Sequence, residues 1–566
     1  MMMLTALYED PSFQRTDDQD SAGRILLTYK RANAMMQRCG MTLEDIGSCS
    51  PRFWSMNRDP AMVLDMGCAN ILACSYNLFL GVMAHIIPRR ADLEPLTERA
   101  LKGEIVGNFL LTEVGHGLDF LNLETTATMV TGGFLLNTPH SGAAKFMPPT
   151  TPICPKVAIV FARLLVNNSD RGVHPFLVHT SDENGMCAGV TSKPLPSRCG
   201  TSPLDYALTS FANVYLPASA FLGIKADSRE NQELLQEYIW RTVVGQVTIS
   251  LAAVTGMKMS SYIGVKYSFR RHVQGRRSTR VPIMAFRTQQ LPMLYITAIT
   301  HVLDAWTPVL LQQFTSPQLS IDVRRGLAAV YKITTCRFLT QCVPEVAERL
   351  GAQGTFVRNF VNRLEMDIRG FSIADGDITA IGIRLFPQLL LKKLSLPTPL
   401  HDDSMLSLHS NGVHSQCRQI LDGFSEGRRD ERFNDLILPQ CQRGVLALGC
   451  AYAYGCAVDA GVPTPLLQLF ECAAIKHDPL WYTQHAGLSA DVLMLNEDRA
   501  ARAALPKIQE YVDQFGVDGA VDVPILSDDK WEQWVAGLEN YDGCGGQGTT
   551  DATVAVSASQ ELRSKL

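Results

Sequence analysis

A block of strand-forming residues lies between long helical stretches, and this order limits the possible folds more than any other feature. Before the block, residues 61–85 are rich in Ala, Leu and Met and contain no proline. From about residue 106 short β-prone runs alternate with Gly, Pro, Asn and Asp, and after Pro217 the helical pattern returns. Helices and strands are therefore segregated along the chain, which predicts an α+β fold without βαβ units.

The strand block and the helices that follow it have clear limits in the sequence. Turn residues at 131–133 separate two strand-like flanks. The later helical stretches contain few breakers and are long enough for a helical bundle. We expect strands at 124–128, 134–137, 157–166, 175–179 and 206–215, and helices at 61–85, 93–101, 237–269, 289–314 and 321–350.

The length of 566 residues allows three or four domains. A proline-punctuated segment at 396–400 and the polar stretch 401–418 mark one boundary. We expect an N-terminal helical domain over 1–105, a β-domain over 106–225, a first C-terminal helical bundle over 226–395 and a second helical domain with a flexible tail over 396–566.

Charge and composition exclude several classes of protein. The 51 Lys and Arg against 56 Asp and Glu leave a net charge of −5, without the basic excess of a nucleic-acid-binding protein. An apolar fraction of 46% is too high for a disordered chain. The mean hydropathy of +0.03 is high for a soluble protein and predicts large buried interfaces or a wide apolar pocket.

Common catalytic and nucleotide-binding motifs are missing from the sequence. No GxGxxG follows a strand, and GxxxxGK[ST] and HExxH do not occur. A GxSxG string occurs once, at residues 423–427, in a part of the chain expected to be helical and not at a strand-to-helix turn. The 15 cysteines form no CxxC and no pairs with zinc-ligand spacing, so we expect reduced thiols and no metal site. The sequence therefore favours neither Rossmann or P-loop binding nor metal or serine-hydrolase chemistry.

The two ends of the chain bear on its location. The N-terminal residues contain no apolar core of a signal peptide, and the apolar stretch 243–257 is shorter than a membrane span requires. We expect no membrane span. The chain ends in Ser564-Lys565-Leu566, after a Gly, Thr, Ser and Ala run. This tripeptide is typical of the signal that the peroxisomal import receptor binds, and predicts a peroxisomal location.

The strongest functional signal is the segment 110–148, which contains a glycine-rich loop before the first strands. Gly115 and Gly117 allow the backbone to approach a ligand closely. Thr112 offers a hydroxyl that a flat heterocycle could use as a hydrogen-bond donor. The glycines alone would also suit an ordinary loop.

The whole string resembles the acyl-CoA oxidases, the FAD-dependent peroxisomal relatives of the acyl-CoA dehydrogenases. The family's T-E-x-G-H-G loop, L-E/Q-T-T-A-T strand, (I/L)-x-(S/T)-P hairpin and K-W-W-P-G turn are similar to residues 112–117, 123–128, 135–139 and 145–149. The resemblance implies FAD bound at Thr112, Gly115, Gly117 and Pro149. Pro149 replaces the family's glycine and has no N–H to donate to the flavin.

Three weaker matches lie beyond the β-domain. Residues 267–271 look like the family's Y-S-x-x-R, which implies that Arg271 lies near the FAD pyrophosphate across a homodimer interface. A solvated basic loop is the alternative, because several arginines cluster there. Residues 286–290 resemble F-Q-T-Q-Q and residues 351–355 resemble G-G-H-G-Y, which adds Gln289, Gly351 and Gly354 to the expected FAD site.

The family's catalytic glutamate follows the second glycine of that last loop by 21 residues, which leads here to Asp375. Aspartate is shorter than glutamate by one methylene, or about 1.5 Å of reach. Asp375 is therefore our candidate for the base. The sequence Asp-Gly-Asp could also be only a polar turn, and Glu365 and Asp377 are the nearest substitutes.

The resemblance implies an acyl-CoA dehydrogenase/oxidase-like fold and an FAD-dependent oxidase. Such an enzyme desaturates an acyl thioester between its α and β carbons and passes the electrons to molecular oxygen, giving hydrogen peroxide. The substitutions at Asp375 and Pro149 favour an alternative, a flavoenzyme of specialised metabolism that acts by cyclisation, hydroxylation or dehydrogenation on a non-CoA substrate. A non-catalytic partner subunit is a third hypothesis.

Overall fold

The computed structural model describes residues 21–223, 228–275 and 279–540, together with residues 4, 7, 8, 10, 12 and 13 near the amino terminus. The chain divides into two compact units, residues 1–523 and residues 524–566. The described part of the second unit holds a short 3-10 turn, Pro524–Leu526, and helix α19, Asp528–Ala536. Every candidate site residue lies in the first unit.

Residues 21–101 form a group of helices. The predicted helix at 61–85 is divided, because Asp65 accepts hydrogen bonds from Gly67 N and Cys68 N and starts a new helix. The segment that follows is a π-helix, η2, which is a rare conformation. The elements are α1 Ser21–Cys39, α2 Leu43–Ser48, α3 Pro51–Asn57, α4 Ala61–Leu64, α5 Met66–Leu72, η2 Ala73–Leu80, α6 Gly81–Ile86 and α7 Glu94–Leu101.

Two sheets follow, and their facing apolar side chains form one core. The larger sheet has the order β10-β3-β2-β5-β6-β7, with β1 paired in parallel to β5, and the smaller has the order β4-β9-β8. The strands are β1 Val106–Leu110, β2 Thr126–Val130, β3 Gly133–Asn137, β4 Lys145–Pro149, β5 Lys156–Val166, β6 Ser169–Asp182, β7 Gly185–Met186, β8 Val190–Pro194, β9 Tyr206–Phe211 and β10 Val214–Pro217.

The sequence patterns find most of this β-region. The runs at 124–128, 134–137, 157–166 and 175–179 fall on β2, β3, β5 and β6, although the last is longer than predicted. The predicted strand at 206–215 is two strands, β9 and β10, because the chain turns at Asn213 with φ of 49°. The patterns miss β1, β4, β7 and β8.

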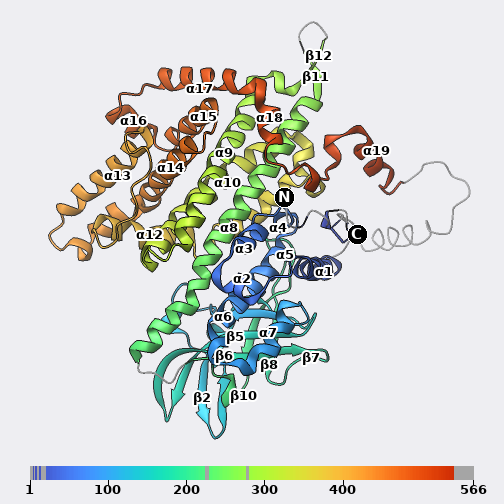
Figure 1. Ribbon diagram of the computed structural model, residues 1–566, viewed down its shortest axis with the longest axis vertical. Coiled ribbons are helices and arrows are strands. Elements are labelled where there is room, and N and C mark those ends of the chain that lie inside the picture. The colour runs from blue at the N-terminus through green and yellow to red at the C-terminus, as the bar shows by residue number, and fades with distance from the viewer. Residues whose placement is uncertain are drawn as a thin grey trace, which may run out of the picture. The chain divides into compact units, whose positions relative to one another are not determined.

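Three long helices form the centre of the molecule: α8 Ser228–Arg270, α9 Arg287–Thr315 and α10 Ile321–Arg349. They confirm the predicted helices at 237–269, 289–314 and 321–350. Figure 1 shows α8 running from beside the sheets to the hairpin of β11, His272–Gln274, and β12, Arg280–Pro282. The later helices are α11 Val361–Phe371, α12 Ile378–Leu390, α13 Met405–Asp422, α14 Cys441–Asp459, α15 Thr464–Ile475, α16 Pro479–His485, α17 Ala490–Ala504 and α18 Ile508–Asp513.

Burial accounts for the high apolar content. Two helical stretches, Met66–Arg89 and Arg287–Thr315, are long and apolar enough to cross a membrane by composition alone. In each stretch, 61% of the most apolar 18 residues are buried inside the fold. This burial is what core helices of a folded domain show. All cysteines in the described ranges are free thiols, in agreement with the sequence prediction.

Candidate active site

Asp375 lies in the loop that joins α11 to α12, and its carboxyl group points to α8. The backbone at Asp375 is left-handed, with φ of 52°, and Gly376 follows with φ of 104°. A Cβ atom placed on Gly245 of α8 would lie only 1.9 Å from Asp375 Oδ2. The carboxyl group therefore occupies the space that a side chain at 245 would fill.

The environment of this carboxyl group suits a base that works near neutral pH. Burial raises the pKa of Asp375 to about 6, and the Lys332 ammonium opposes that shift. Within the part of the chain that the structure describes, no hydrogen-bond donor stabilises the carboxylate. An ionised carboxylate without such donors keeps its lone pairs available for a proton.

The π-helix η2 forms another wall of this site. Asn77 Nδ2 would lie 3.3 Å from the same Cβ position at Gly245. The Asn77 side chain is fixed by the buried Arg241, which donates to Asn77 Oδ1 at 2.8 Å and accepts from Asn77 Nδ2 at 3.0 Å through its carbonyl. π-Helical turns occur frequently at functional sites, because they reposition a side chain within a helix.

Gln246 stands next to Gly245 on α8 and reaches the loop. Its Nε2 donates to the carbonyl oxygen of Asp375 at 3.0 Å. Its Oε1 is buried and has no hydrogen-bond partner among the described residues. A buried acceptor without a partner is costly, so a donor on a bound ligand would stabilise it.

The two substitutes for Asp375 have other surroundings. Asp377 is the N-cap of α12, and its Oδ1 accepts from Thr379 N at 2.8 Å and Ala380 N at 3.1 Å. Glu365 lies within α11, about two turns before that helix ends at Phe371. The geometry thus favours Asp375 as the base, and Asp377 supports the helix that follows it.

The T-E-x-G-H-G loop is held in place by a buried ion pair. Glu113 and Lys145 are both fully buried and lie 2.8 Å apart. The Glu113 carboxylate also accepts from Glu124 N at 2.7 Å and Thr125 N at 3.0 Å. Sequence reasoning missed this structural role, although both residues lie in the matched motifs, because the pairing of two distant segments has no local signal.

Thr112 lies beside this ion pair on a partly apolar surface. Its carbonyl accepts from Phe146 N at 2.9 Å. Val114 and Phe146 are 51% and 41% exposed on either side of it. A Cβ at Gly117 would meet no atom within 4 Å, whereas Gly115 is tied to Gly142 O through its N–H at 2.8 Å. The open space at Gly117 and the uncovered apolar side chains can accept a flat ring.

Pro149 ends strand β4 and is buried in the sheet. Its carbonyl oxygen accepts from Asn108 Nδ2 at 3.2 Å and Lys156 Nζ at 3.0 Å. The residue therefore offers a flavin only van der Waals contact. Burial and then the charge of Asp375 raise the pKa of the Cys74 thiol of η2 to about 12, so this thiol is uncharged near neutral pH.

Four predicted residues gather at the far end of the long helices. Gln289 Nε2 donates to Ser268 Oγ at 2.8 Å and Arg349 O at 3.2 Å, which joins the ends of α8, α9 and α10. Arg271 is exposed where α8 ends. Gly351 has φ of 62° with open space around its Cα. Gly354 packs under the Ala347 carbonyl, 1.9 Å from where a Cβ would lie.

The predicted residues thus form two groups that one chain does not bring together. The stretch of α8 from Gly245 to Arg270 spans about 38 Å at 1.5 Å per residue. Thr112 and Pro149 lie in the β-region, Asp375 faces Gly245, which is 17 residues into α8, and Arg271 directly follows the end of α8 beside the β11–β12 hairpin. The two groups therefore lie at different positions along α8.

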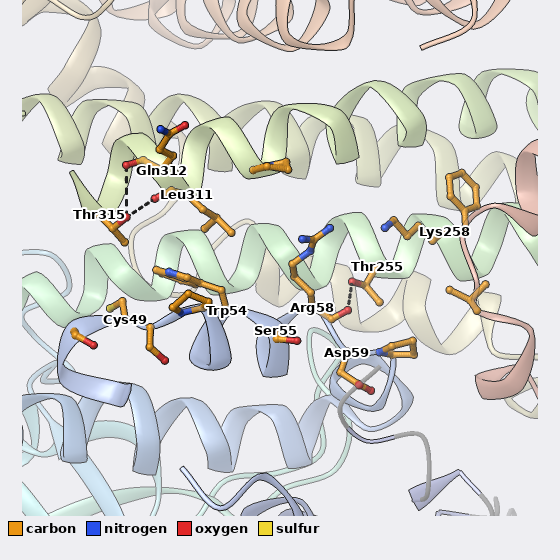
Figure 2. A pocket seen from close by; sticks show the side chains of 17 residues that line it. Cys49, Trp54, Ser55, Arg58, Asp59, Thr255, Lys258, Leu311, Gln312 and Thr315 are labelled. Atoms are coloured by element: carbon orange, nitrogen blue, oxygen red, sulfur yellow. Dashed lines mark hydrogen bonds between the residues drawn. The ribbon is translucent and has the colours of Figure 1, made fainter. Parts of the chain in front are cut away.

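Another cavity of about 800 Å³ lies between α3, α8 and α9 (Figure 2). Its polar wall includes Arg58 and Lys258, which share the carboxylate of Asp304 at 3.1 Å and 2.7 Å. Thr255 donates to the Arg58 carbonyl at 3.0 Å in the same wall. None of the predicted site residues lines this cavity.

Comparison with known proteins points to one group of enzymes. No family model matches the chain. Peroxisomal acyl-coenzyme A oxidase 3 of Homo sapiens is 26% identical over 347 residues, covering 58% of this chain and 48% of that protein. Peroxisomal acyl-coenzyme A oxidase 2 of Arabidopsis thaliana is 26% identical over 305 residues, covering 49% and 44%. The chain matches about half the length of these curated relatives.

Solved structures extend the likeness to the whole fold. Acyl-CoA oxidase1 of Yarrowia lipolytica superposes with a TM-score of 0.81 at 17% identity, covering 99% of this chain and 92% of that one. Acyl-CoA oxidase-1 of Caenorhabditis elegans, solved with FAD and ATP, gives 0.76 at 16% identity, covering 99% and 93%. The predicted acyl-CoA dehydrogenase/oxidase-like fold and the resemblance to acyl-CoA oxidases are confirmed.

Proposed function

We propose that this chain is an FAD-dependent acyl-CoA oxidase-like enzyme in which Asp375 removes the α-proton of an acyl thioester. The observation that carries the proposal is the carboxyl group of Asp375, which is directed at α8 without a hydrogen-bond donor in the described part of the chain. It occupies the position that the resemblance assigns to the family's base, in a chain with the fold of acyl-CoA oxidases.

The chemistry follows from the residues around the carboxyl group. Asp375 is ionised above about pH 6 and can then accept a proton. Gly245 leaves the carboxyl group room beside α8, and Asn77 and Gln246 line the same space. FAD, when bound, would supply the acceptor for the β-hydride and a route for the two electrons to molecular oxygen, with hydrogen peroxide as the product.

The residues around Thr112 fit FAD. The hydroxyl of Thr112 can form a hydrogen bond with the edge of a flavin. The exposed side chains of Val114 and Phe146 can pack against the apolar faces of the ring system. Open space at Gly117 admits the ring system. Pro149 can contact the ring only through van der Waals interactions, because it has no N–H to donate. The buried Glu113–Lys145 pair keeps these segments in register.

The second group of residues supports a homodimer. The end of α8 at Arg270, which Arg271 follows, lies about 38 Å along the helix from Gly245, so Arg271 serves a partner's FAD in this proposal. Its guanidinium fork matches phosphate oxygens. Phe286, in one of the matched segments, and Phe356, directly after another, are 45% and 43% exposed, which supplies apolar surface for a subunit contact.

We also propose a peroxisomal location, which the names of the relatives and the terminal tripeptide support. The human and Arabidopsis relatives carry the word peroxisomal in their names. Ser564-Lys565-Leu566, which we expect the peroxisomal import receptor to bind, lies outside the described residues.

One observation favours the alternative reaction on a non-CoA substrate. The buried Oε1 of Gln246 has no donor among the described residues and lies on the side chain that holds Asp375. A substrate with a hydroxyl or amide N–H near its reacting carbon would satisfy it. A specialised metabolite with such a group is the second candidate.

Anaerobic mixing tests the proposal. The purified protein should contain FAD, and an acyl-CoA should bleach the flavin absorbance in one turnover. Admission of oxygen should restore the colour and produce hydrogen peroxide. A colourless protein would contradict both flavoenzyme hypotheses, and a yellow protein that no acyl-CoA bleaches would favour the non-CoA substrate.

A further inference from the structure

Lys332 is a lysine in the middle of α10 whose side chain is fully buried. Its Nζ donates to the carbonyl oxygen of Gly376 at 2.6 Å and to that of Ala374. These two carbonyls belong to the residues on either side of Asp375. The ammonium thus reaches the base loop from the side of α10.

The backbone of this loop requires such a donor. Asp375 has φ of 52°, a left-handed conformation that is unfavourable for a residue with a side chain, and Gly376 follows with φ of 104°. The carbonyls of residues 374 and 376 face the same ammonium, and Gln246 Nε2 donates to the carbonyl between them. Three consecutive carbonyl oxygens are therefore each held by a side chain.

Lys332 does not pair directly with a carboxylate. Among the described residues, no carboxylate oxygen lies within 4.0 Å of its Nζ, and burial lowers the pKa of its ammonium. The negative charges that act on it come from Asp375 and Asp377 of the loop, and the Cys336 thiol on its own helix is uncharged near neutral pH because burial raises its pKa to about 11. Its hydrogen bonds go to the backbone, and its charge acts on Asp375 through space.

We propose that Lys332 is a positioning residue that holds the base loop in its left-handed conformation and directs the carboxyl group of Asp375 towards Gly245. The catalytic consequence of this inference rests on the proposed function. The contact by which Lys332 holds the base loop does not depend on that function. A buried lysine that stabilised the fold without holding this loop would leave the hydrogen exchange of residues 374–378 unchanged when replaced.

The groups around Asp375 define the pH dependence. Lys332 faces it from α10 and Cys74 from η2, while α8 presents the uncharged Gly245 and Gln246. The Asp377 carboxylate already accepts the N-cap hydrogen bonds of α12. Removal of the ammonium leaves burial unopposed, so the pH at which Asp375 ionises rises.

The test compares Lys332→Met with Lys258→Met, a control at a mostly buried lysine of α8 that pairs with Asp304. We expect Lys332→Met to accelerate amide hydrogen exchange in peptides covering residues 372–380 by at least about tenfold. The pH midpoint of flavin reduction should rise by about one unit or more. Lys258→Met should change neither quantity.

Two further measurements keep the inference falsifiable if Lys332→Met does not fold. Lys332→Gln retains an N–H donor without the charge, and should raise the pH midpoint while slowing exchange relative to Lys332→Met. In the unaltered holoenzyme, the amides of Ala374 and Ile378, which bond to Gly370 O and Ser372 O, should exchange as slowly as those within α12.

The outcomes separate the two proposals. Rapid exchange of Ala374 and Ile378 in the unaltered protein, or unchanged exchange and midpoint in the Lys332 variants, would overturn the role of Lys332 alone. Failure of every acyl-CoA to bleach the unaltered holoenzyme would overturn the proposed function, and the exchange results would still decide whether Lys332 holds the loop.

Discussion

At the residue scale, Asp375 and Gly245 are matched in size. Oδ2 of Asp375 already approaches the backbone of α8, so a glutamate pointing in the same direction would have no room for its extra methylene. This gives a structural reason for the shorter acid. The sequence led to Asp375 through its spacing from Gly354, but it could not reveal Gly245 or Lys332, which meet the loop from other helices.

Substitution of Gly245 by alanine tests this fit. The new Cβ would lie 1.9 Å from Asp375 Oδ2 and must displace the carboxyl group. We expect flavin reduction to slow by about a hundredfold, since a displacement near 1 Å has that effect. Stopped-flow reduction by acyl-CoA measures it.

Gly382→Ala is the matched control, because its Cβ would meet Ile333 at an ordinary 3.6 Å. Both changes replace a glycine within a helix, which favours helix formation by roughly 1 kcal/mol. Equal rates in the two variants would show that the carboxyl group does not act from its position beside Gly245.

The pKa of Asp375 predicts two opposite responses to pH. Because burial raises it to about 6, the rate of flavin reduction should rise as pH increases through 6 and then level off. The native state favours the protonated acid, so ionisation of Asp375 lowers stability as pH rises from about 4 through 6. A stopped-flow pH profile that is flat between pH 5 and 8 would contradict the assignment.

At the element scale, long periodic helices were predictable and short buried strands were not. The helices α8, α9 and α10 follow from runs without breakers. Strand β1 is buried on every residue and lacks alternation, and β4 contains two prolines, which argue against a strand. The Glu113–Lys145 pair connects β4 to the loop after β1, and sequence alone cannot supply that contact.

Lys145→Met should weaken the fold, because it leaves the Glu113 carboxylate buried without its cation. The expected loss is about 3–5 kcal/mol in the free energy of unfolding. Arg99→Met is the control, since Arg99 and Glu104 are both about half exposed and 3.7 Å apart, and such pairs contribute under about 1 kcal/mol. Urea unfolding measures both variants, and equal losses would show that the buried pair is not what holds the loop.

At the scale of the whole molecule, the order of helices, strands and helices was readable from the sequence, and so was the fold of an acyl-CoA oxidase. The distance between the two groups of site residues could not be predicted from the sequence, because it depends on the length and direction of α8. The division into four domains stays a prediction. The homodimer is a proposal with a direct test.

Hybrid dimers of two inactive variants test whether the site is shared between subunits. Asp375→Asn and Arg271→Ala, co-expressed in equal amounts, should form hybrids in which one site has both residues intact. About one quarter of the unaltered activity should return by the statistics of a symmetric dimer. Activity no higher than that of the separate variants would place Arg271 and Asp375 of the same chain in one site, or Arg271 outside it.

The most direct test of the central claim is single-turnover flavin reduction in Asp375→Asn. The amide is close in size to the acid and removes only its ability to take a proton, so FAD content and folding should be unchanged. We predict that an acyl-CoA which bleaches the flavin of the unaltered enzyme leaves that of Asp375→Asn oxidised. Bleaching at an equal rate in both proteins would show that Asp375 is not the base.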